Sequence, residues 1–500
     1  MDKLYIFAIG GTGARVMKSL TMLMAAGELA DYEVVPILID FDINNGDLVQ
    51  TLRLMHMYKE IHDKSYDMGT PTRNEGFFCS PLTTITSITS NHLPVGHNSF
   101  LMDMPFQHCH MHVRDLLNYN LLHGSEYPFR LLLDSLFTTD PNGEMNQDLS
   151  IGFKGNAKIA HLGYAALKIQ DTIEFKMFLN NIVPNRDKVV VVGSTFGGTG
   201  SVGVLEILKQ LKCTQHIAIN NIATILIRPY FLSKPDPAIG VVDYQSVFTR
   251  RSKEFFKFYS DSGLENFVNT TYKIGIDGFV VFDNAIGGEK QRNIAHIVEL
   301  LSAMAISEYA QTGQHGLFDY NLGRLNLQFG HDRIEEIDFY QFPDGMRVYE
   351  LLTRYILSAK FYKDYFCGNT RITNSYFFRE MQQRNMIERS YKDTLDRMFT
   401  ESFHWIEELS YDHNNKYSLG LFDVNAPMDE IVIRHPYSNN RGGLFAHLFR
   451  RDIVYDYIDN MNAYWHTKRN ETWFKNFSSE QTLIRLLSES SRNIFQQFIN

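Results

Sequence analysis

Cysteine is scarce in this sequence. Its 500 residues contain four cysteines, and they lie too far apart to suggest a disulfide framework. Disulfide scaffolds belong to oxidising compartments, whereas scattered thiols are typical of the reducing cytosol. We therefore expect a cytoplasmic protein. The four positions are Cys79, Cys109, Cys213 and Cys367.

Positive charge is not in excess, and long apolar runs are missing. Lys and Arg number 48 against 57 Asp and Glu, which gives a net charge of -9. No broad basic field for nucleic acid or an anionic membrane is therefore expected, although a local basic groove stays open. No window reaches the ~18 apolar residues of a membrane span. The start, from Met1 to Ile9, lacks the pattern of a signal peptide.

What the sequence does contain is a rhythm of short apolar runs and helical patterns. Strand-like runs alternate with helix-like segments up to about residue 310, which predicts a parallel sheet with right-handed crossovers. The stretch 55–147 has weak periodicity and is interpreted as an insertion. The predicted buried strands are Lys3–Ile9, Glu33–Ile39, Val189–Val192, Ile222–Ile227 and Phe279–Phe282.

The last third of the sequence has a different character. Aromatic residues make up 13% of the chain, and long aromatic amphipathic helices dominate after residue 346. Predicted helices cover Val348–Phe366, Phe377–Trp405 and Leu483–Ile499. We predict an α/β nucleotide-binding domain at 1–310 and a helix-rich domain at 311–500, with a partner surface on the second.

Three glycine-rich loops follow strands or precede helices. Gly10–Gly13 separates the first strand from a helix, and glycines there let a phosphate approach the free N–H groups of the helix start. Together with Asp40 after the next strand, this loop is also close to a dinucleotide-binding fingerprint. A tight turn without a ligand is the competing interpretation. The second loop is Gly152–Asn156, and the third, Gly193–Ser201, lacks the Gly-Lys-Ser/Thr ending of a Walker A loop.

The segment Val189–Ser201 resembles the signature loop of the tubulin/FtsZ superfamily, which contains Gly-Gly-Gly-Thr-Gly-Ser/Thr-Gly. Phe196 and Val202 depart from that pattern. The resemblance spans residues 3–310 without 55–147, and it is closest to divergent bacterial tubulin-like proteins. The other segments that match in family order are Gly10–Gly13, Gly152–Ala166, Asn221–Pro235 and Phe279–Asn284.

This resemblance implies a tubulin/FtsZ-like Rossmannoid fold that binds GTP or GDP, with Mg²⁺. Asn284 and Asn293 are the candidates for reading guanine, although each is equally suited to cap a helix. Asp40 and Asp42, with Asn44, are placed near the phosphates, where they either meet Mg²⁺ or form an Asx turn. The residues implied to contact phosphates are Gly10, Gly11, Thr12, Gly13, Gly155, Asn156, Gly197, Gly198, Thr199, Gly200 and Ser201.

The family's acidic loop is the part that does not match. In tubulin and FtsZ an acidic loop from a neighbouring subunit completes the site for hydrolysis. Here Gly313–Gly323 offers only Asp319, at the wrong spacing, and Glu308 lies at the end of the preceding helix. Asp319 is thus the candidate catalytic residue, and nucleotide binding is better supported than GTP hydrolysis.

Three functions follow from these patterns. The first is a GTP-binding protein of the cytoskeletal type, with GTPase activity left open, that assembles head to tail into filaments. The second is a nucleotide-regulated scaffold without useful turnover. The third is a Rossmann-type enzyme that uses NAD(P) or FAD.

One cluster of histidines stands apart from these loops. His108, His110 and His112 would share a face in a strand, which is a pattern suited to Zn²⁺ or Ni²⁺. Because no distant Cys-x-x-Cys or His pair accompanies them, a polar surface run is the favoured interpretation, and no metal site is predicted.

Overall fold

The fold was analysed in a computed structural model of the chain. It describes residues 1–66, 76–88, 99–104, 110–141, 143–153, 155–214, 221–233, 244–275, 280–282, 293–321, 327–329, 335–337, 344–366, 370–373, 375–384, 387–410, 419–432 and 453–499.

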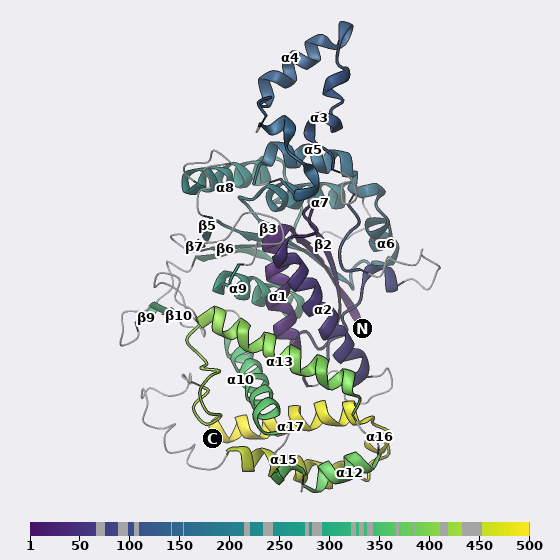
Figure 1. The fold of residues 1–500 in the computed structure, drawn as a ribbon, viewed down its shortest axis with the longest axis vertical. Coiled ribbons are helices and arrows are strands. Elements are labelled where there is room, and N and C mark those ends of the chain that lie inside the picture. Colours follow the sequence, from purple (N-terminus) through teal and green to yellow (C-terminus); the bar gives the residue numbers. More distant parts are fainter. Residues whose placement is uncertain are drawn as a thin grey trace.

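A six-stranded sheet, parallel throughout, forms the centre of the molecule (Figure 1). Its strands run in the order β2-β1-β3-β4-β6-β8. Two small sheets accompany it, one parallel pair (β5 and β7) and one antiparallel pair (β9 and β10). The strands are β1 (Asp2–Ile9), β2 (Tyr32–Ile39), β3 (Lys188–Ser194), β4 (Ile222–Ile227), β5 (Phe231–Ser233), β6 (Thr270–Gly275), β7 (Val280–Phe282), β8 (Gly316–Asn321), β9 (Leu327–Phe329) and β10 (Glu335–Ile337).

Helices cover both faces of the sheet (Figure 1). On one face lie α1 (Gly10–Ala25), α2 (Gly46–Ser65) and α9 (Ile297–Thr312), and on the other α5 (Ala157–Leu167), α6 (Ile173–Asn181), α7 (Gly198–Thr214) and α8 (Tyr244–Asp261). The remaining helices are α3 (Val113–Leu116), α4 (Tyr127–Leu136), α10 (Gly345–Phe361), α11 (Thr370–Thr373), α12 (Tyr376–Arg384), α13 (Arg389–Ser410), α15 (Ile453–Lys468), α16 (Thr472–Lys475) and α17 (Ser479–Ile499). Short helical turns are η1 (Ile85–Ser87), η2 (Tyr119–Leu121), η3 (Gly124–Glu126), η4 (Glu144–Asn146), η5 (Leu149–Ile151), η6 (Ile169–Asp171) and the π-helical η10 (Tyr362–Phe366).

The strands are apolar at nearly every position because both faces of the sheet are covered. Side chains alternate between the two faces of a strand. In β1, Leu4 and Ile6 therefore enter the core beneath α1 and α9, whereas Tyr5 and Phe7 enter the core beneath α5, α6 and α7. The sheet thus separates two hydrophobic cores.

The helices beyond residue 344 pack on the α1 and α2 face. Helix α13 lies against both, and the Trp405 indole donates a hydrogen bond to the Ser19 hydroxyl at 3.4 Å. Its buried side chains belong to the same hydrophobic cluster as those of α1, α2 and α9. The domain boundary at residue 310 stays a prediction, and the described helices after it share a core with the sheet.

The predicted elements largely form, with four differences. The α/β sheet and its first four predicted strands are confirmed. The predicted strand 279–282 forms over Val280–Phe282 but pairs with β5, and β6 takes the place beside β4 in the main sheet. Helix α2 runs eleven residues into the stretch interpreted as an insertion, from 55 to 65. The helical pattern that the sequence shows over Asn293–Tyr309 begins four residues later in the structure, because α9 starts at Ile297 after the cap His296. The long pattern Phe377–Trp405 divides into α12 and α13.

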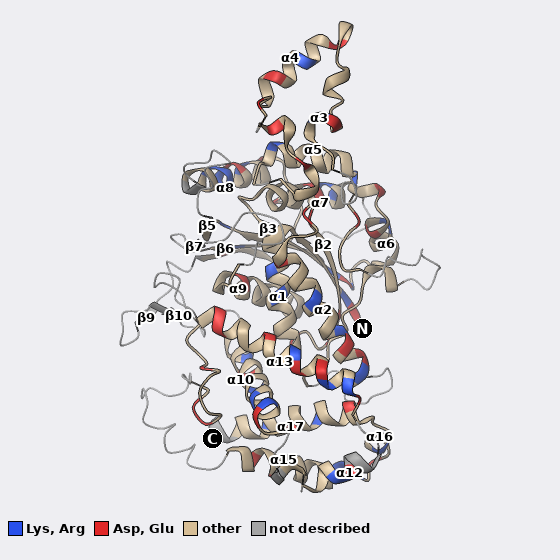
Figure 2. Ribbon diagram, viewed as in Figure 1, with Lys and Arg blue, Asp and Glu red and all other residues tan. Residues whose placement is uncertain are grey.

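Basic and acidic side chains are interspersed along the described helices (Figure 2). No helix in the described ranges is both long enough and apolar enough to cross a membrane.

The close packing of α7 against α5 and β1 at Gly203 provides a test of the fold. A Cβ atom at Gly203 on α7 would lie 2.6 Å from Ile9 Cγ2 and even closer to the Tyr164 hydroxyl on α5. We expect Gly203→Ala to destabilise the protein, because overpacking costs about 1–3 kcal/mol and outweighs the helix propensity gain of up to about 1 kcal/mol. Urea denaturation measures this difference.

A second substitution separates crowding from other effects. Tyr164→Phe removes the oxygen that lies closest to the new methyl group, and it also removes the hydrogen bond to the Thr199 carbonyl. The comparison is therefore a double-mutant cycle, and Gly203→Ala should cost less in the Tyr164→Phe background than in the unsubstituted chain. A neutral or stabilising Gly203→Ala substitution would contradict the packing of α5, α7 and β1.

Candidate functional site

The first and third glycine loops lie side by side at the carboxyl edge of the sheet. The chain leaves β1 toward β2 on one side and returns to β3 on the other, so the edge between β1 and β3 is a topological switch point. Ligands of doubly wound sheets bind in the crevice at such a point. Helix α1 starts at Gly10, directly after β1, and α7 starts at Gly198, shortly after β3.

The starts of these two helices touch each other. Gly10 has a φ of +71°, and a Cβ atom there would lie 3.2 Å from the backbone nitrogen of Gly200. A Cβ atom at Gly13 would lie 2.7 Å from the carbonyl carbon of Ala8. No side chain caps the first turn of α1. The glycines therefore bring two helix N-termini together and leave their N–H groups facing one region.

The second glycine loop closes against the same region. Phe153 packs on Phe41 with ring centroids 4.4 Å apart, and a Cβ atom at Gly198 would lie 3.2 Å from the backbone nitrogen of Asn156. The Tyr164 hydroxyl donates a hydrogen bond to the Thr199 carbonyl at 3.1 Å. The structure thus brings all three loops into contact, with Lys154 outside the described residues.

The polar side chains of these loops mainly hold the loops themselves. The Ser201 hydroxyl donates to the Gly197 carbonyl. The side-chain oxygen Oδ1 of Asn156 accepts from Lys158 N at 3.0 Å and caps α5, and its side-chain nitrogen Nδ2 donates to Glu144 at 2.6 Å. Backbone N–H groups are therefore the main donors that this site offers to an anion.

Two carboxylates lie beyond β2, next to the second loop. Asp42 N donates to Asp40 Oδ1 at 3.2 Å, and a Cβ atom at Gly152 would lie 3.2 Å from Asp42 Cβ. Burial raises the pKa of Asp40 to about 7. A protein usually gives Mg²⁺ one or two carboxylates while phosphates and water supply the rest, so this pair fits the predicted ion. Asn44 is exposed.

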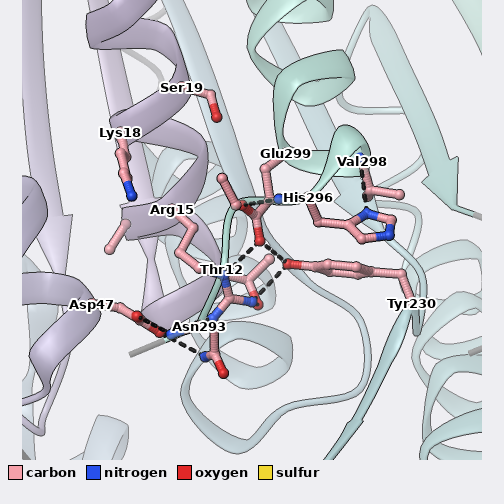
Figure 3. Close-up of polar contacts among 12 residues, drawn as sticks. Thr12, Arg15, Lys18, Ser19, Asp47, Tyr230, Asn293, His296, Val298 and Glu299 are labelled. Carbon is pink, nitrogen blue, oxygen red and sulfur yellow. Dashed lines mark hydrogen bonds and ion pairs between the residues drawn. The ribbon is translucent and has the colours of Figure 1, made fainter. Parts of the chain in front are cut away.

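Arg15 is the centre of a buried network of polar side chains next to the first turn of α1 (Figure 3). Arg15 donates to Glu299 at 2.6 Å, to Asp47 at 3.1 Å and to the Tyr230 hydroxyl at 2.6 Å. Its fourth contact is the Thr12 hydroxyl at 3.5 Å. Burial alone lowers the pKa of Arg15, but Tyr230 and the two carboxylates more than reverse that effect. Both acids also lie in first turns, Asp47 of α2 and Glu299 of α9, where the helix dipole favours them.

Asn293, a predicted guanine reader, belongs to this network. Its backbone nitrogen donates to Asp47 at 2.8 Å and its side-chain amide at 2.7 Å. Asp47 thus holds the approach to α9 against the start of α2. The second predicted reader, Asn284, lies outside the described residues, and the guanine contacts of both stay a prediction.

Asp319, the candidate catalytic residue, lies apart from the loops. It sits in the edge strand β8 and forms a two-bond ion pair with Arg228 at 2.8 and 2.6 Å. Strand β8 is three strands from β3, which places it about 14 Å away across the sheet. Within one chain Asp319 does not join the glycine loops, and a contribution to a neighbouring chain's site stays a prediction.

The two described histidines of the cluster have separate carboxylate partners. His110 pairs with Asp148 at 2.8 Å and His112 with Asp115 at 3.3 Å. Among the described residues, no three His, Cys, Asp or Glu side chains are grouped to hold a metal. His108 lies outside them.

Sequence reasoning missed two arginines. Arg251 on α8 donates to the carbonyl of Gly155 in the second loop, whereas its neighbour Arg250 is exposed and pairs with Glu254. Arg15 is the second arginine. Its position within the mostly apolar pattern of α1 was the signal that could have identified it, because a charged side chain is rarely buried without a partner of opposite charge.

Comparison with known proteins adds no family. No family model matches the chain. No curated protein and no solved structure matches it either. The α/β fold with its parallel sheet stands on the structure, and the tubulin/FtsZ resemblance rests on the motif segments alone.

The arginine network predicts an asymmetric response to substitution. Arg15→Met leaves Asp47 and Glu299 buried with no cation, and we expect a loss of about 3–5 kcal/mol in the free energy of unfolding. In a Glu299→Gln background the same substitution should cost less, because one unpaired charge is gone. Urea denaturation of the four chains measures the coupling.

Lys18→Met is the matched control, since Lys18 pairs with Glu408 one turn along α1 and is less buried. It should cost no more than about 1 kcal/mol. Equal costs for Arg15→Met and Lys18→Met would contradict the role given to burial.

The raised pKa of Asp40 predicts that the stability of the protein depends on pH. Its pKa rises from 3.8 to about 7 on folding, so between these values the folded chain holds a proton that the unfolded chain has lost. Stability then falls as pH rises. Asp40→Asn should remove roughly 2–3 kcal/mol of the decrease between pH 5 and pH 8. The measurement is urea denaturation across this range, and parallel profiles for Asp40→Asn and the unsubstituted chain would refute the prediction.

The exposed Asp31 supplies the control. Asp31→Asn makes the same chemical change at the surface, and its pH profile is measured alongside that of Asp40→Asn.

Proposed function

We propose that the three glycine loops bind the phosphate chain of a guanine nucleotide. One observation supports this most: the uncapped start of α1 and the start of α7 meet at the switch point of the sheet. Each helix N-terminus offers free N–H groups and the positive end of a dipole. Two of them side by side favour an anion with several charges, such as a di- or triphosphate.

Charged groups around the loops support the same ligand. Arg251 adds a guanidinium beside Gly155, next to the start of α7. Asp40 and Asp42 provide oxygen ligands for the Mg²⁺ that accompanies a nucleotide triphosphate. Because burial raises the pKa of Asp40 to about 7, Mg²⁺ binding would release a proton near neutral pH.

The choice of guanine over NAD rests on the second loop and on the resemblance. A dinucleotide places its ribose beside the acidic residue at the end of the second strand. Here Phe153 of the second loop packs on Phe41 over that strand end. This disfavours a Rossmann-type NAD(P) or FAD enzyme, and the motif segments of the tubulin/FtsZ type favour GTP or GDP.

Turnover is a separate question from binding. In the proposed head-to-tail assembly, hydrolysis needs an acidic group from a neighbouring chain, and Asp319 is the candidate for that role. Its two-bond pairing with Arg228 neutralises the carboxylate. This observation favours the second candidate function, a nucleotide-regulated scaffold that binds GTP or GDP with little hydrolysis.

Isothermal titration of the full chain with GTP, GDP, ATP and NAD, each with Mg²⁺, tests the proposal. We expect GTP to bind at least tenfold more tightly than ATP or NAD. Arg251→Ala should weaken GTP binding by about 10- to 100-fold, since a charged hydrogen bond to phosphate contributes about 1.5–3 kcal/mol. Arg250→Ala is the matched control and should bind like the unsubstituted chain.

Two outcomes would overturn these assignments. Tight binding of NAD without binding of GTP would show that the ligand is a dinucleotide and not a guanine nucleotide. Equal effects of Arg250→Ala and Arg251→Ala would show that Arg251 does not contribute to the site. Phosphate release measured at rising protein concentration separates the two functions. A more than linear increase supports assembly-coupled hydrolysis, and no release at any concentration supports the scaffold.

A further inference from the structure

An arm built from the described residues of 113–151 projects from the molecule beyond α5 (Figure 1). It contains α3, α4 and the turns η2 to η5. Six large apolar side chains between residues 121 and 136 are exposed, from 48% for Phe129 to 71% for Leu121. Monomeric proteins rarely expose such a gathering without a partner.

Helix α4 exposes most of its apolar side chains, whereas an ordinary surface helix buries them against the core. Its buried side chains, Leu133 and Phe137, face the arm. On the same side, Asp134 accepts a hydrogen bond from the Tyr119 hydroxyl, and Arg130 lies over the Tyr119 ring at 4.6 Å. Both charged side chains thus engage Tyr119, while Asp134 stays exposed at the edge of the outward arc. The exposed arc covers about 200° of the helix and presents Tyr127, Pro128, Phe129, Leu131, Leu132, Ser135 and Leu136.

The root of the arm is held firmly. The Lys158 ammonium donates to the Leu136 carbonyl at 3.3 Å and pairs with Glu144 at 3.5 Å. Glu144 also accepts from the Asn156 amide at 2.6 Å. These contacts fix the end of α4 to the start of α5, so the apolar surface is presented in one orientation. A surface that is already ordered loses little conformational entropy on binding.

We propose that the arm is a self-association surface, on which α4 of one chain packs against α4 of a second copy. A two-fold interface requires a patch that complements itself. The centre of the outward arc of α4 has no charged side chain, and the exposed Asp134 lies at its edge beside Tyr127. Two copies can therefore bring the apolar centres of their arcs together without opposing like charges there. Because the arm projects from the body, the two bodies, each with a net charge of -9, stay apart.

The area available agrees with a weak dimer. Half of a leucine or aromatic side chain exposes on the order of 100 Å², so the six side chains supply about 600 Å² on each copy. A pair then buries about 1,200 Å², which is the lower end of specific interfaces. We therefore expect a reversible dimer with a dissociation constant in the micromolar range.

Charge disfavours a membrane as the occupant. Helices that lie in a membrane surface are usually rich in Lys and Arg on their polar face. Residues 111–137 contain no lysine and carry Arg114 and Arg130 against Asp115, Glu126 and Asp134. Figure 2 shows how few basic residues the arm has.

Sedimentation velocity of the full chain between about 1 and 100 µM tests the proposal. The unsubstituted chain should dimerise with rising concentration. The double substitution Leu131→Asp with Leu132→Asp should weaken the dimer at least about 100-fold, because it places four uncompensated charges in the interface. Both positions are 51% exposed, so the fold should tolerate the change.

A charge-matched control and a milder variant complete the experiment. Val49→Asp with Ile173→Asp adds the same charge at exposed positions away from the arm and should leave the dimer intact. If the first variant loses its circular dichroism signal, Phe129→Ser with Leu136→Ser replaces it and should also give a monomer.

Three results would overturn the proposal. They are a monomer at every concentration, a dimer that persists in both arm variants, and flotation of a monomeric chain with zwitterionic phosphatidylcholine vesicles that the arm variants abolish. The last result would assign the arm to a lipid surface. None of these measurements uses nucleotide, so the outcome is independent of the proposed GTP site.

Discussion

The buried charge of Arg15 constrains the whole α1 face of the sheet. A guanidinium that is 3% exposed must find carboxylates, and those available are Asp47 on α2 and Glu299 on α9. Each of these acids has a second task, since Asp47 holds Asn293 and Glu299 accepts from His296 N at the start of α9. Buried ion pairs add little net stability, but breaking one is costly. The network therefore fixes where three helices begin relative to one another.

The glycine loops depend on this arrangement. Thr12 lies in the first turn of α1, and its hydroxyl is 3.5 Å from the Arg15 guanidinium. The network of Arg15 therefore holds the first loop in position on one side. From the other side, α5 holds the third loop through Tyr164 and Thr199. The region between β1 and β3 is thus shaped by side chains that do not themselves face a ligand. Rigid support of this kind is what a binding site made of backbone N–H groups requires.

The two ends of the molecule differ in where they place their apolar side chains. The helices around α13 bury their apolar faces on α1 and α2, so their aromatic side chains form core rather than surface. The arm does the opposite, because α4 exposes Leu131, Leu132 and Leu136 to solvent. The partner surface predicted on the aromatic C-terminal half stays a prediction, and among the described residues the largest exposed apolar gathering lies between residues 121 and 136.

The sequence by itself determined four of the six strands of the sheet and the glycine loops, because local chemistry decides both. Runs such as Val189–Val192 can only be strands buried on two faces, and glycines directly after a strand mark a turn into a helix. It could not determine which charges pair, since Arg15 is 284 residues from Glu299. Nor could it determine the partners of weak strands: β7 lies beside β5, and β8 forms the sheet edge in the segment that was compared with the family's acidic loop. The orientation of α4 was equally hidden, because its apolar pattern is the same whether the leucines face a core or solvent. Tertiary packing decided these points, since long-range contacts override local preference wherever a segment is short or its pattern fits two environments.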